Sequence, residues 1–552
     1  MFKNRRQWAA SACFLTLAAA AGAAPGPEVT VDAAAGQHTI SADIYGMNFA
    51  PEALAQELAL PVRRWGGNRT TRYNWRIDVD NTGSDWFYEN IPNPLPNDGR
   101  TLPEGTATDR FVEQDRRTGT RTLMTLPMTG WVAKRRPPGD NHPYDCGFKV
   151  SRYGAQQQTD FWDSDCGNGL RPDGSPVTGN DPADTSVAVG TAFVQDWVRH
   201  LVAHYGRANA GGVKFYNLDN EPELWRHTHR DIRPQPLGYD ELRDRTVQYA
   251  TAVKAIDPGA KILGPASWGW TAYFYSDLDT YPGGDWWNDP KDRKAHGNTP
   301  LAEWYLQQMR AHEQATGQRV LDYLDEHYYP QASGVFSNDT SAATNALRLR
   351  ATRSLWDASY VDESWINEPV QLIPRMRGWV ATNYPGTRLA IGEYNFGALH
   401  HINGALAQAD LLGIFGREGL HLATLWSPPA ASEPGAFAFR MYRNVDGAGG
   451  KFGTHGVKAT SADQGKLSVY AARRGPNGPL TLMAVNKSGT ALSSTVKLQN
   501  FPAAAKAKAK VWRYSPANLS AIQALAKVPV TGGVINAELP ADSITMYLVP
   551  VK

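Results

Sequence analysis

The order of short apolar runs along the chain constrains its fold more than any other feature. Most of these runs are followed by a longer stretch with apolar residues at three and four spacing. Such alternation of strand and helix patterns is typical of parallel βαβ units, and eight units predict a (β/α)8 barrel. The runs cover residues 43–49, 62–65, 122–128, 213–221, 260–267, 321–329, 388–396 and 421–429, and the helical patterns cover 191–205, 239–256, 301–316, 370–383 and 405–418.

The sequence pattern changes near residue 466. Short strand patterns separated by turns replace the long helices, which is typical of a β-sandwich. The segment 28–41 resembles a hairpin of the same sandwich, so this domain is expected to be discontinuous. The predicted fold is α/β: a TIM-like barrel at 42–460 with a smaller β-sandwich domain at 24–41 plus 461–552. The gaps 69–121 and 130–186 are long and polar, and we expect them to form loops above the barrel.

The N-terminus has the parts of a secretory signal peptide, predicted at residues 1–23. Lys3, Arg5 and Arg6 precede an apolar run, and small residues follow it. We therefore expect secretion to the periplasm or the extracellular space. No other stretch of about 20 apolar residues is present, so no membrane association is expected.

Charge and composition argue against a nucleic-acid partner and are compatible with a carbohydrate one. The formal net charge is +2, and removing the three basic residues of the leader brings it to −1. Without a Lys/Arg-rich run, nucleic-acid binding is not expected. The 18 Trp and 23 Tyr suffice to line a groove that stacks on sugar rings as well as to fill a core. We expect the protein to act as a monomer.

Two cysteines remain after the leader, Cys146 and Cys166. In an oxidising compartment this pair predicts a disulfide that closes a local loop, with two free thiols as the alternative. A zinc site on these cysteines is not expected, because they form no CxxC and no HxxxH pattern lies next to them in the sequence.

Polar residues end several predicted strands, where their side chains converge over the mouth of a barrel. Asn220-Glu221-Pro222 ends the fourth strand, and Gly392-Glu393-Tyr394-Asn395 ends the seventh. Two carboxyl groups facing across the mouth suit glycoside hydrolysis, which needs a protonated carboxyl and an ionised one and no cofactor. We predict Glu221 as the acid/base and Glu393 as the nucleophile. A separation of roughly 5–5.5 Å would indicate retention of configuration, and roughly 6.5–9.5 Å inversion.

Further side chains at strand ends are expected to hold the substrate or the carboxylates. Arg64 and the Tyr394 hydroxyl are predicted to bond Glu393, and Asn220 to bond a sugar hydroxyl. Trp65 and Trp426 are expected to form platforms under sugars. The full predicted substrate-binding set is Arg64, Trp65, Asn220, His327, Tyr329, Tyr394 and Trp426.

Three other carboxylates compete for these roles. Glu223 lies two residues past the strand end and is expected to make a surface or supporting contact. Glu326 is expected to support His327, and Asp219 to face away from the mouth. A second Asn-Glu-Pro, at 367–369, precedes a helical pattern and is interpreted as a helix start.

Several stretches together resemble glycoside hydrolase family 44, in order from about residue 40 to the C-terminus. The resemblance implies a barrel with a β-sandwich and a retaining endo-acting enzyme on β-1,4-glucans, often including xyloglucan. It places the acid/base at Glu221 and the nucleophile at Glu393. It also implies a structural calcium, for which Glu89, Asp163 and Asp165 are candidate ligands; the alternative is that they are solvated loop acids. The matching stretches are RWGGNRTTRYNW (64–75), DCGNG (165–169), YNLDNEPELW (216–225), THRDI (228–232), DEHYYP (325–330), GEYNFG (392–397) and FRMYRNVDG (439–447).

Other functions remain open at this level. A xylanase or mannanase on a related barrel would share the aromatic groove and differ in the shape of its subsites. A carbohydrate-binding protein without catalysis would be expected to lack one carboxylate, and both are present.

Overall fold

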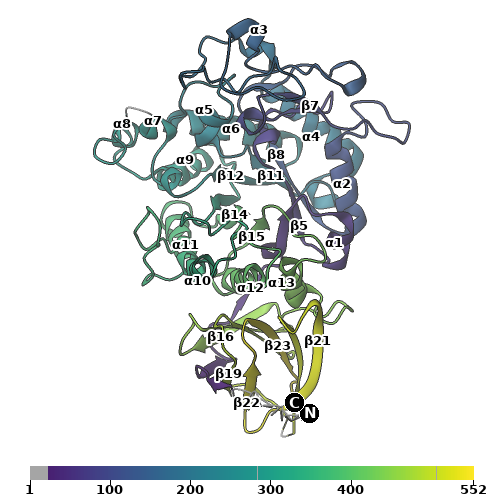
Figure 1. The fold of residues 1–552 in the computed structure, drawn as a ribbon, viewed down its shortest axis with the longest axis vertical. Helices are drawn as coiled ribbons and strands as arrows, with labels where there is room; N and C mark the ends of the chain where they lie inside the picture. The colour runs from purple at the N-terminus through teal and green to yellow at the C-terminus, as the bar shows by residue number, and fades with distance from the viewer. Residues whose placement is uncertain (1–22, 282–283, 505) are drawn as a thin grey trace, which may run out of the picture.

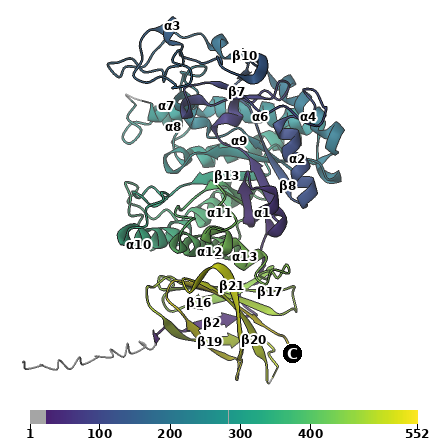
Figure 2. The same ribbon diagram turned by 45° about the vertical axis from the view of Figure 1, so that its right-hand side comes forward.

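The computed structural model describes residues 23–281, 284–504 and 506–552, so the predicted signal peptide lies outside the described residues except for its last position. A larger region of strands and helices is stacked on a smaller region of strands (Figures 1 and 2). No helix in the described part of the chain is long and apolar enough to cross a membrane.

The larger region contains the predicted barrel. Among the described residues, eight parallel strands close in the order β11-β12-β13-β14-β15-β4-β5-β8, and each overlaps one of the eight apolar runs. The fold class is therefore confirmed. The strands are β4 (Gly46–Asn48), β5 (Val62–Trp65), β8 (Arg121–Leu126), β11 (Phe215–Leu218), β12 (Lys261–Ser267), β13 (Tyr323–Tyr328), β14 (Arg388–Tyr394) and β15 (Leu422–Leu425).

Helices cover the outside of the barrel (Figure 1), and five of them match the predicted helical patterns. These five are α4 (Thr191–Tyr205), α6 (Tyr239–Ile256), α9 (Leu301–Thr316), α11 (Leu372–Asn383) and α12 (Ile402–Arg417). The second Asn-Glu-Pro lies just ahead of α11 and ends no strand. Helices α1 (Glu52–Glu57), α10 (Ala342–Ala351) and α13 (Pro434–Arg443) were not predicted.

Helix α2 (Ala107–Thr118) lies in a gap predicted to be loop, and its composition explains the error. Few of its residues are apolar, and it buries the carboxylate of Asp115 against Arg63 of β5 at 2.7 Å. Its start and stop signals were nevertheless present: a capping box between Thr106 and Asp109, and Gly119 at φ 70° after its last residue.

The rest of the two long gaps forms loops above the barrel with short strands and helices. The predicted disulfide between Cys146 and Cys166 is present within them. The short elements here are β6 (Val79–Asn81), β7 (Asn90–Pro92), β9 (Trp131–Ala133), α3 (Val150–Tyr153) and β10 (Ser186–Ala188), and those after β11 and β12 are α5 (Trp225–Thr228), α7 (Asp277–Thr280) and α8 (Lys291–Ala295).

The smaller region is built almost entirely of strands from both ends of the chain. Strand β2 pairs with β16 and β19, so the N-terminal segment joins the C-terminal one. Strand β16 begins at His455, ahead of the predicted domain boundary at 461. It lies between β2 and β17, and so joins the strands around β2 and β19 to those from β17 to β21. The strands enclose an apolar core separate from that of the barrel. The strands are β1 (Ala24–Pro25), β2 (Val29–Asp32), β3 (His38–Thr39), β16 (His455–Ser461), β17 (Leu467–Arg473), β18 (Leu480–Asn486), β19 (Leu492–Gln499), β20 (Lys508–Ser515), β21 (Asn518–Pro529), β22 (Val534–Leu539) and β23 (Ser543–Val549).

The two regions share a buried interface. Asp410 of α12 accepts a hydrogen bond from the Tyr470 hydroxyl at 2.6 Å and pairs with Lys487 at 3.0 Å. Nearby, the rings of Phe437 and Tyr514 stack with centroids 4.7 Å apart. Asp410 and Lys487 thus pair across the interface, and losing either one would leave a buried charge unpaired.

Candidate active site

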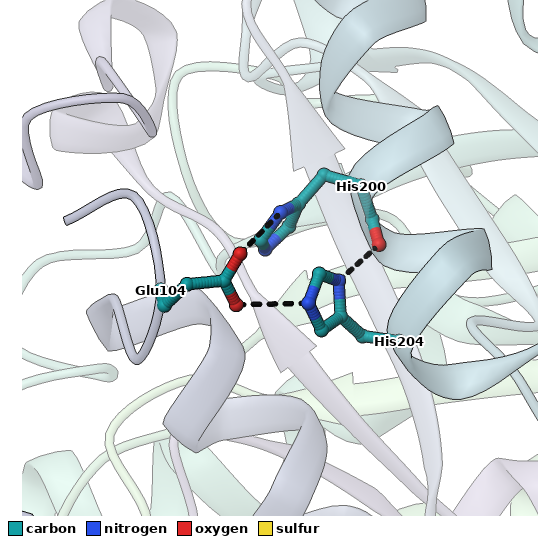
Figure 3. Close-up of side chains that lie close together, drawn as sticks. All are labelled: Glu104, His200 and His204. Carbon is teal, nitrogen blue, oxygen red and sulfur yellow. Dashed lines mark hydrogen bonds and ion pairs between the residues drawn. The ribbon is translucent and has the colours of Figure 1, made fainter. Parts of the chain in front are cut away.

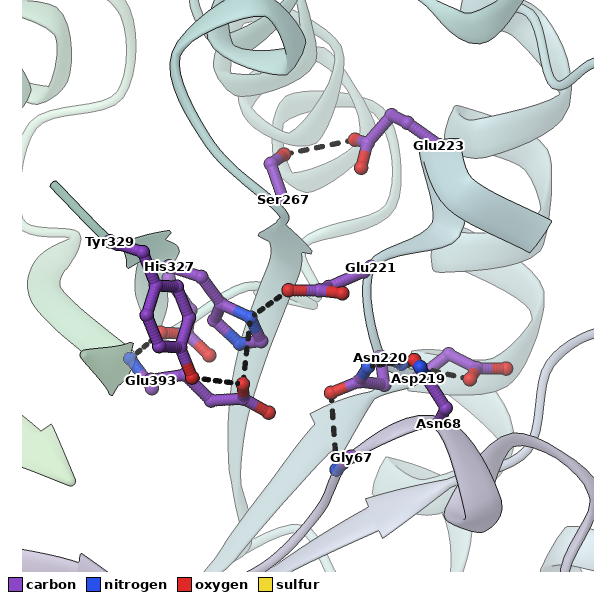
Figure 4. Close-up of polar contacts among 12 residues, drawn as sticks. Gly67, Asn68, Asp219, Asn220, Glu221, Glu223, Ser267, His327, Tyr329 and Glu393 are labelled. Atoms are coloured by element: carbon purple, nitrogen blue, oxygen red, sulfur yellow. Dashed lines mark hydrogen bonds and ion pairs between the residues drawn. The ribbon is translucent and has the colours of Figure 1, made fainter. Parts of the chain in front are cut away.

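The turn after β11 separates three polar side chains that are adjacent in sequence. Asp219 and Glu221 both have left-handed backbones, with φ of 67° and 45°. Non-glycine residues in this region are uncommon and cluster at functional sites. As a result Asp219 turns toward Thr71, Asn220 toward β5, and Glu221 toward the barrel axis (Figure 4).

Glu221 and Glu393 meet at His327, which lies between them at the end of β13 (Figure 4). His327 Nδ1 is 2.9 Å from Glu221 Oε1 and 3.7 Å from Glu393 Oε2. One oxygen of each carboxylate lies within 4.8 Å of the other. The structure thus brings together the two carboxylates that were predicted as a catalytic pair.

Glu393 is the more heavily supported of the two carboxylates. Arg64 Nη1 donates to its Oε1 at 2.6 Å, and the Tyr329 hydroxyl donates to its Oε2 at 2.9 Å. Arg64 also donates to Asn220 Oδ1 at 3.0 Å, which ties the ends of β5 and β11 together. The positions predicted for Arg64, Asn220 and Tyr329 are therefore all at the site.

Burial and nearby charges shift the pKa values of the two carboxyl groups in opposite directions. Burial raises the pKa of Glu221, and His327 only partly opposes this. Burial acts in the same direction on Glu393, but the charges of His327 and Arg64 together with hydrogen bonds outweigh it and lower the pKa of Glu393. The pKa of His327 is raised: burial acts to lower it, and the two carboxylates prevail. One group is thus disposed to hold a proton and the other to remain ionised.

Two residues predicted for the site point away from it. Trp65 is 9% exposed and packs against Phe49, Tyr73 and Phe111 in the apolar layer, so it forms no sugar platform. The Tyr394 hydroxyl accepts a hydrogen bond from Gln408 of α12 and does not bond Glu393. Both predictions were wrong for the same reason: each residue follows an inward-facing one on its strand and must face outward.

The three competing carboxylates agree with expectation to different degrees. Glu223 is buried, not at the surface, and accepts a hydrogen bond from the Ser267 hydroxyl at 2.9 Å. Glu326 does not support His327, because it lies on the opposite side of β13, fully buried and with neither oxygen hydrogen-bonded within the described residues. Asp219 faces away from the pair, as predicted, and bonds Thr71 at 2.6 Å.

A layer of polar side chains beneath the pair was not predicted. Asn217 accepts from Arg64 Nε at 3.0 Å and donates to Asp325 at 2.9 Å, and Asp325 in turn accepts from the Gly392 amide at 2.7 Å. Asn48 accepts from Arg64 Nη1 at 3.1 Å. The sequence did carry a signal: Asp325 precedes His327 by two positions, and so shares its face of the strand.

Aromatic side chains surround the mouth. Trp426 is half-buried beside Phe49, which is 40% exposed, at a ring separation of 6.2 Å. Gly67, at φ 88°, passes so close that a Cβ there would lie 2.5 Å from the Trp426 ring. A second pocket is lined by Glu223 together with Trp268, Trp286 and Trp365. Trp270 is instead buried under Arg375.

The predicted calcium ligands are only partly brought together. Glu89 lies beside Asp160, and burial together with Asp160 raises the pKa of Glu89 to about 8. Within the described residues, Glu89 Oε1 and Asp160 Oδ1 are buried without a hydrogen-bond partner, so the pair fits a hard cation such as calcium. Asp163 is close enough to contribute to the raised pKa. Asp165 instead binds the Ser151 amide and hydroxyl, so its assignment as a ligand was wrong. Asp160 and the exposed His142, which sequence reasoning missed, are the residues that lie with Glu89.

Comparison with known proteins gives consistent relatives. The model of glycoside hydrolase family 44 matches residues 79–332. A bifunctional glucanase-xylanase from a metagenome library, CelM2, is 42% identical with a TM-score of 0.91, covering 96% of this chain and 100% of that one. A Paenibacillus polymyxa family 44 xyloglucanase, solved with xyloglucan, is 31% identical with a TM-score of 0.77, covering 95% and 100%. Endoglucanase A of Paenibacillus lautus is 33% identical over 479 residues, which is 83% of this chain and 63% of that protein's length.

Proposed function

The chain belongs to glycoside hydrolase family 44, and we propose from this premise that it is a retaining endo-β-1,4-glucanase acting on cellulose derivatives and xyloglucan. The observation that carries the proposal is the approach of Glu221 and Glu393 to within 4.8 Å. So close an approach of two carboxylate oxygens favours the shorter carboxyl separation of retaining enzymes, roughly 5–5.5 Å, over the roughly 6.5–9.5 Å of inverting ones.

In the first step of the proposed reaction, one Glu393 oxygen attacks the anomeric carbon while Glu221 transfers its proton to the departing glycosidic oxygen. This forms a glycosyl ester on Glu393 and releases the chain fragment that carries the new hydroxyl. In the second step Glu221, now ionised, takes a proton from water, whose oxygen displaces Glu393 from the sugar. The opposite pKa shifts of the two groups support this order of roles.

The aromatic residues around the mouth support the proposal that the substrate is a polysaccharide bound at several sugars. In this proposal Trp426 lies under the sugar at the cleavage point, and the pocket of Trp268, Trp286 and Trp365 holds sugars further along the chain. Xylanase activity is the second candidate, favoured by the likeness to the glucanase-xylanase CelM2.

Two further properties are proposed on separate grounds. Secretion rests on the leader-like N-terminus and agrees with the disulfide, which persists in oxidising compartments. Calcium binding rests on the orphaned oxygens of Glu89 and Asp160. The ion would neutralise the buried carboxylates and cross-link the disulfide loop 146–166 to β7; it takes no part in the reaction.

The function is tested by reducing-end release from carboxymethylcellulose, xyloglucan, xylan and mannan, with Glu393→Gln as the blank. Release from the glucans that disappears in the blank is the expected result, and the ratio of rates ranks the polymers. Release from mannan alone, or no release by folded protein from any polymer, would contradict the proposal.

A further inference from the structure

Two histidines on the outer layer of the barrel face one carboxylate. His200 and His204 lie four residues apart on α4, and therefore on the same side of the helix. Glu104, in the connection between β7 and α2, reaches toward both rings (Figure 3). Its Oε2 is 2.8 Å from His204 Nε2, and its Oε1 is 3.9 Å from His200 Nδ1.

The second nitrogen of each ring has a partner that can only accept a hydrogen bond. His200 Nε2 lies 2.9 Å from a carboxylate oxygen of Asp109, and His204 Nδ1 lies 2.8 Å from the backbone oxygen of His200. Each of these nitrogens must therefore carry a proton. In the neutral rings, the two remaining nitrogens direct lone pairs at the Glu104 carboxylate. A cation held between the two rings and the carboxylate would be bound by all three.

We propose that Glu104, His200 and His204 bind a zinc ion. One ligand atom from each lies within 4.8 Å of the others, close enough to contract around one ion. Two imidazoles and a carboxylate are a usual zinc ligand set and a poor one for calcium or magnesium. The Glu104 and His204 side chains are 43% and 40% exposed, which leaves an entry path and room for water as fourth ligand.

Asp109 connects this site to the start of α2. One of its oxygens faces His200, and the other accepts the Thr106 amide at 3.2 Å in the capping box. A carboxylate behind a histidine ligand is the usual means of orienting the ring toward a metal. The bound ion would therefore tie the β7–α2 connection to α4. It is a separate cluster from the catalytic pair and from the Glu89–Asp160 site, and it offers two imidazoles where the latter offers one, that of His142.

The test is a calorimetric titration of the mature, chelator-treated chain with ZnCl2 in excess CaCl2, which keeps the Glu89–Asp160 site loaded. The wild type is compared with His204→Ala and Glu104→Gln, and with His455→Ala as a matched loss of one imidazole from the sheet region. The wild type and His455→Ala should show one zinc site that His204→Ala weakens at least about tenfold. Glu104→Gln should weaken the same site, and because Glu104 is on an exposed connection its effect is independent of helix stability.

Cobalt provides a second readout. Co2+ bound to wild type should give the intense visible absorption of four-coordinate cobalt with nitrogen ligands, and His204→Ala should lose it. Equal zinc stoichiometry and affinity in wild type, His204→Ala and Glu104→Gln would overturn the proposal. So would the absence of zinc binding to the folded wild type. Zinc bound at the catalytic pair is common to all variants and cancels in the comparison.

Discussion

The inner and outer faces of the barrel strands differ in the side chains they bury: charged groups on the inner face and aromatic rings on the outer face. On the inner face, Arg64, His327 and Glu393 are buried, and each finds a charged partner. On the outer face, the next residues along the chain are Trp65 and Tyr394, which pack against rings of the helical layer. Glu326 is the exception: a carboxylate on the outer face without a partner among the described residues. The alternation of side chains along a strand decides which residue faces the mouth, and the charged partners it meets there decide whether it is protonated.

The largest expected difference between the faces is at neighbouring residues of β14. Glu393→Gln removes the proposed nucleophile and should lower kcat on the order of a thousandfold or more. Tyr394→Phe removes only the hydrogen bond from Gln408 and should leave kcat within a few-fold. Steady-state kinetics on xyloglucan measures both. A large kcat loss in Tyr394→Phe with unchanged thermal stability would contradict the assignment of Tyr394 to the outer, non-catalytic face.

Glu221 is expected to act through proton transfer. Glu221→Ala should lower the rate on polymers by about 100- to 10,000-fold, and much less on aryl glycosides whose leaving group departs without a proton. The two substrate types are compared by kcat/KM for the same variant. Equal losses on both would remove the acid role from Glu221.

Arg64 and Trp65 are expected to affect different quantities. Arg64→Met removes a positive charge that lowers the pKa of Glu393, so the acid limb of kcat/KM should move to higher pH. The direction follows because Glu393 must be ionised, and a higher pKa keeps it protonated to higher pH. Trp65→Ala should leave the limb in place and lower the free energy of unfolding by about 3–5 kcal/mol. An unmoved limb in Arg64→Met would contradict the electrostatic role.

Trp65 and Trp426 offer a further contrast. Both were predicted as sugar platforms, but Trp65 is buried and Trp426 is half-buried at the mouth. Trp426→Ala should therefore weaken binding and turnover of polymers while costing less stability than Trp65→Ala. Michaelis constants and denaturant unfolding of the two variants separate the roles, and equal effects on both measurements would show that Trp426 is also a core residue.

The smallest expected effect concerns Glu326. Burial raises its pKa well above the ordinary value, so the folded protein holds this proton after the unfolded chain has lost it. Its contribution is therefore complete below the unfolded pKa and is lost as pH rises toward the folded pKa. Glu326→Gln should flatten the alkaline decline of Tm relative to wild type. Parallel Tm curves across pH would show that Glu326 is already ionised in the fold.

The sequence was sufficient for the barrel and the catalytic pair because both depend on local patterns. Eight apolar runs and two strand-end glutamates needed no tertiary information. The errors at Trp65 and Tyr394 arose where the face of a strand had to be chosen, and there the period of two would have corrected them. Asp160 could not have been found in this way, because its approach to Glu89 depends on the fold of the disulfide loop.

The central claim, that Glu221 and Glu393 are close enough for direct attack, is tested most directly by the stereochemistry of the product. Proton NMR during the first minutes of xyloglucan hydrolysis resolves the anomeric signals of the new reducing ends before they interconvert. Retention predicts that the β-anomer appears first and the α-anomer only later, by mutarotation. Early appearance of the α-anomer would show inversion and contradict the role of Glu393 as nucleophile.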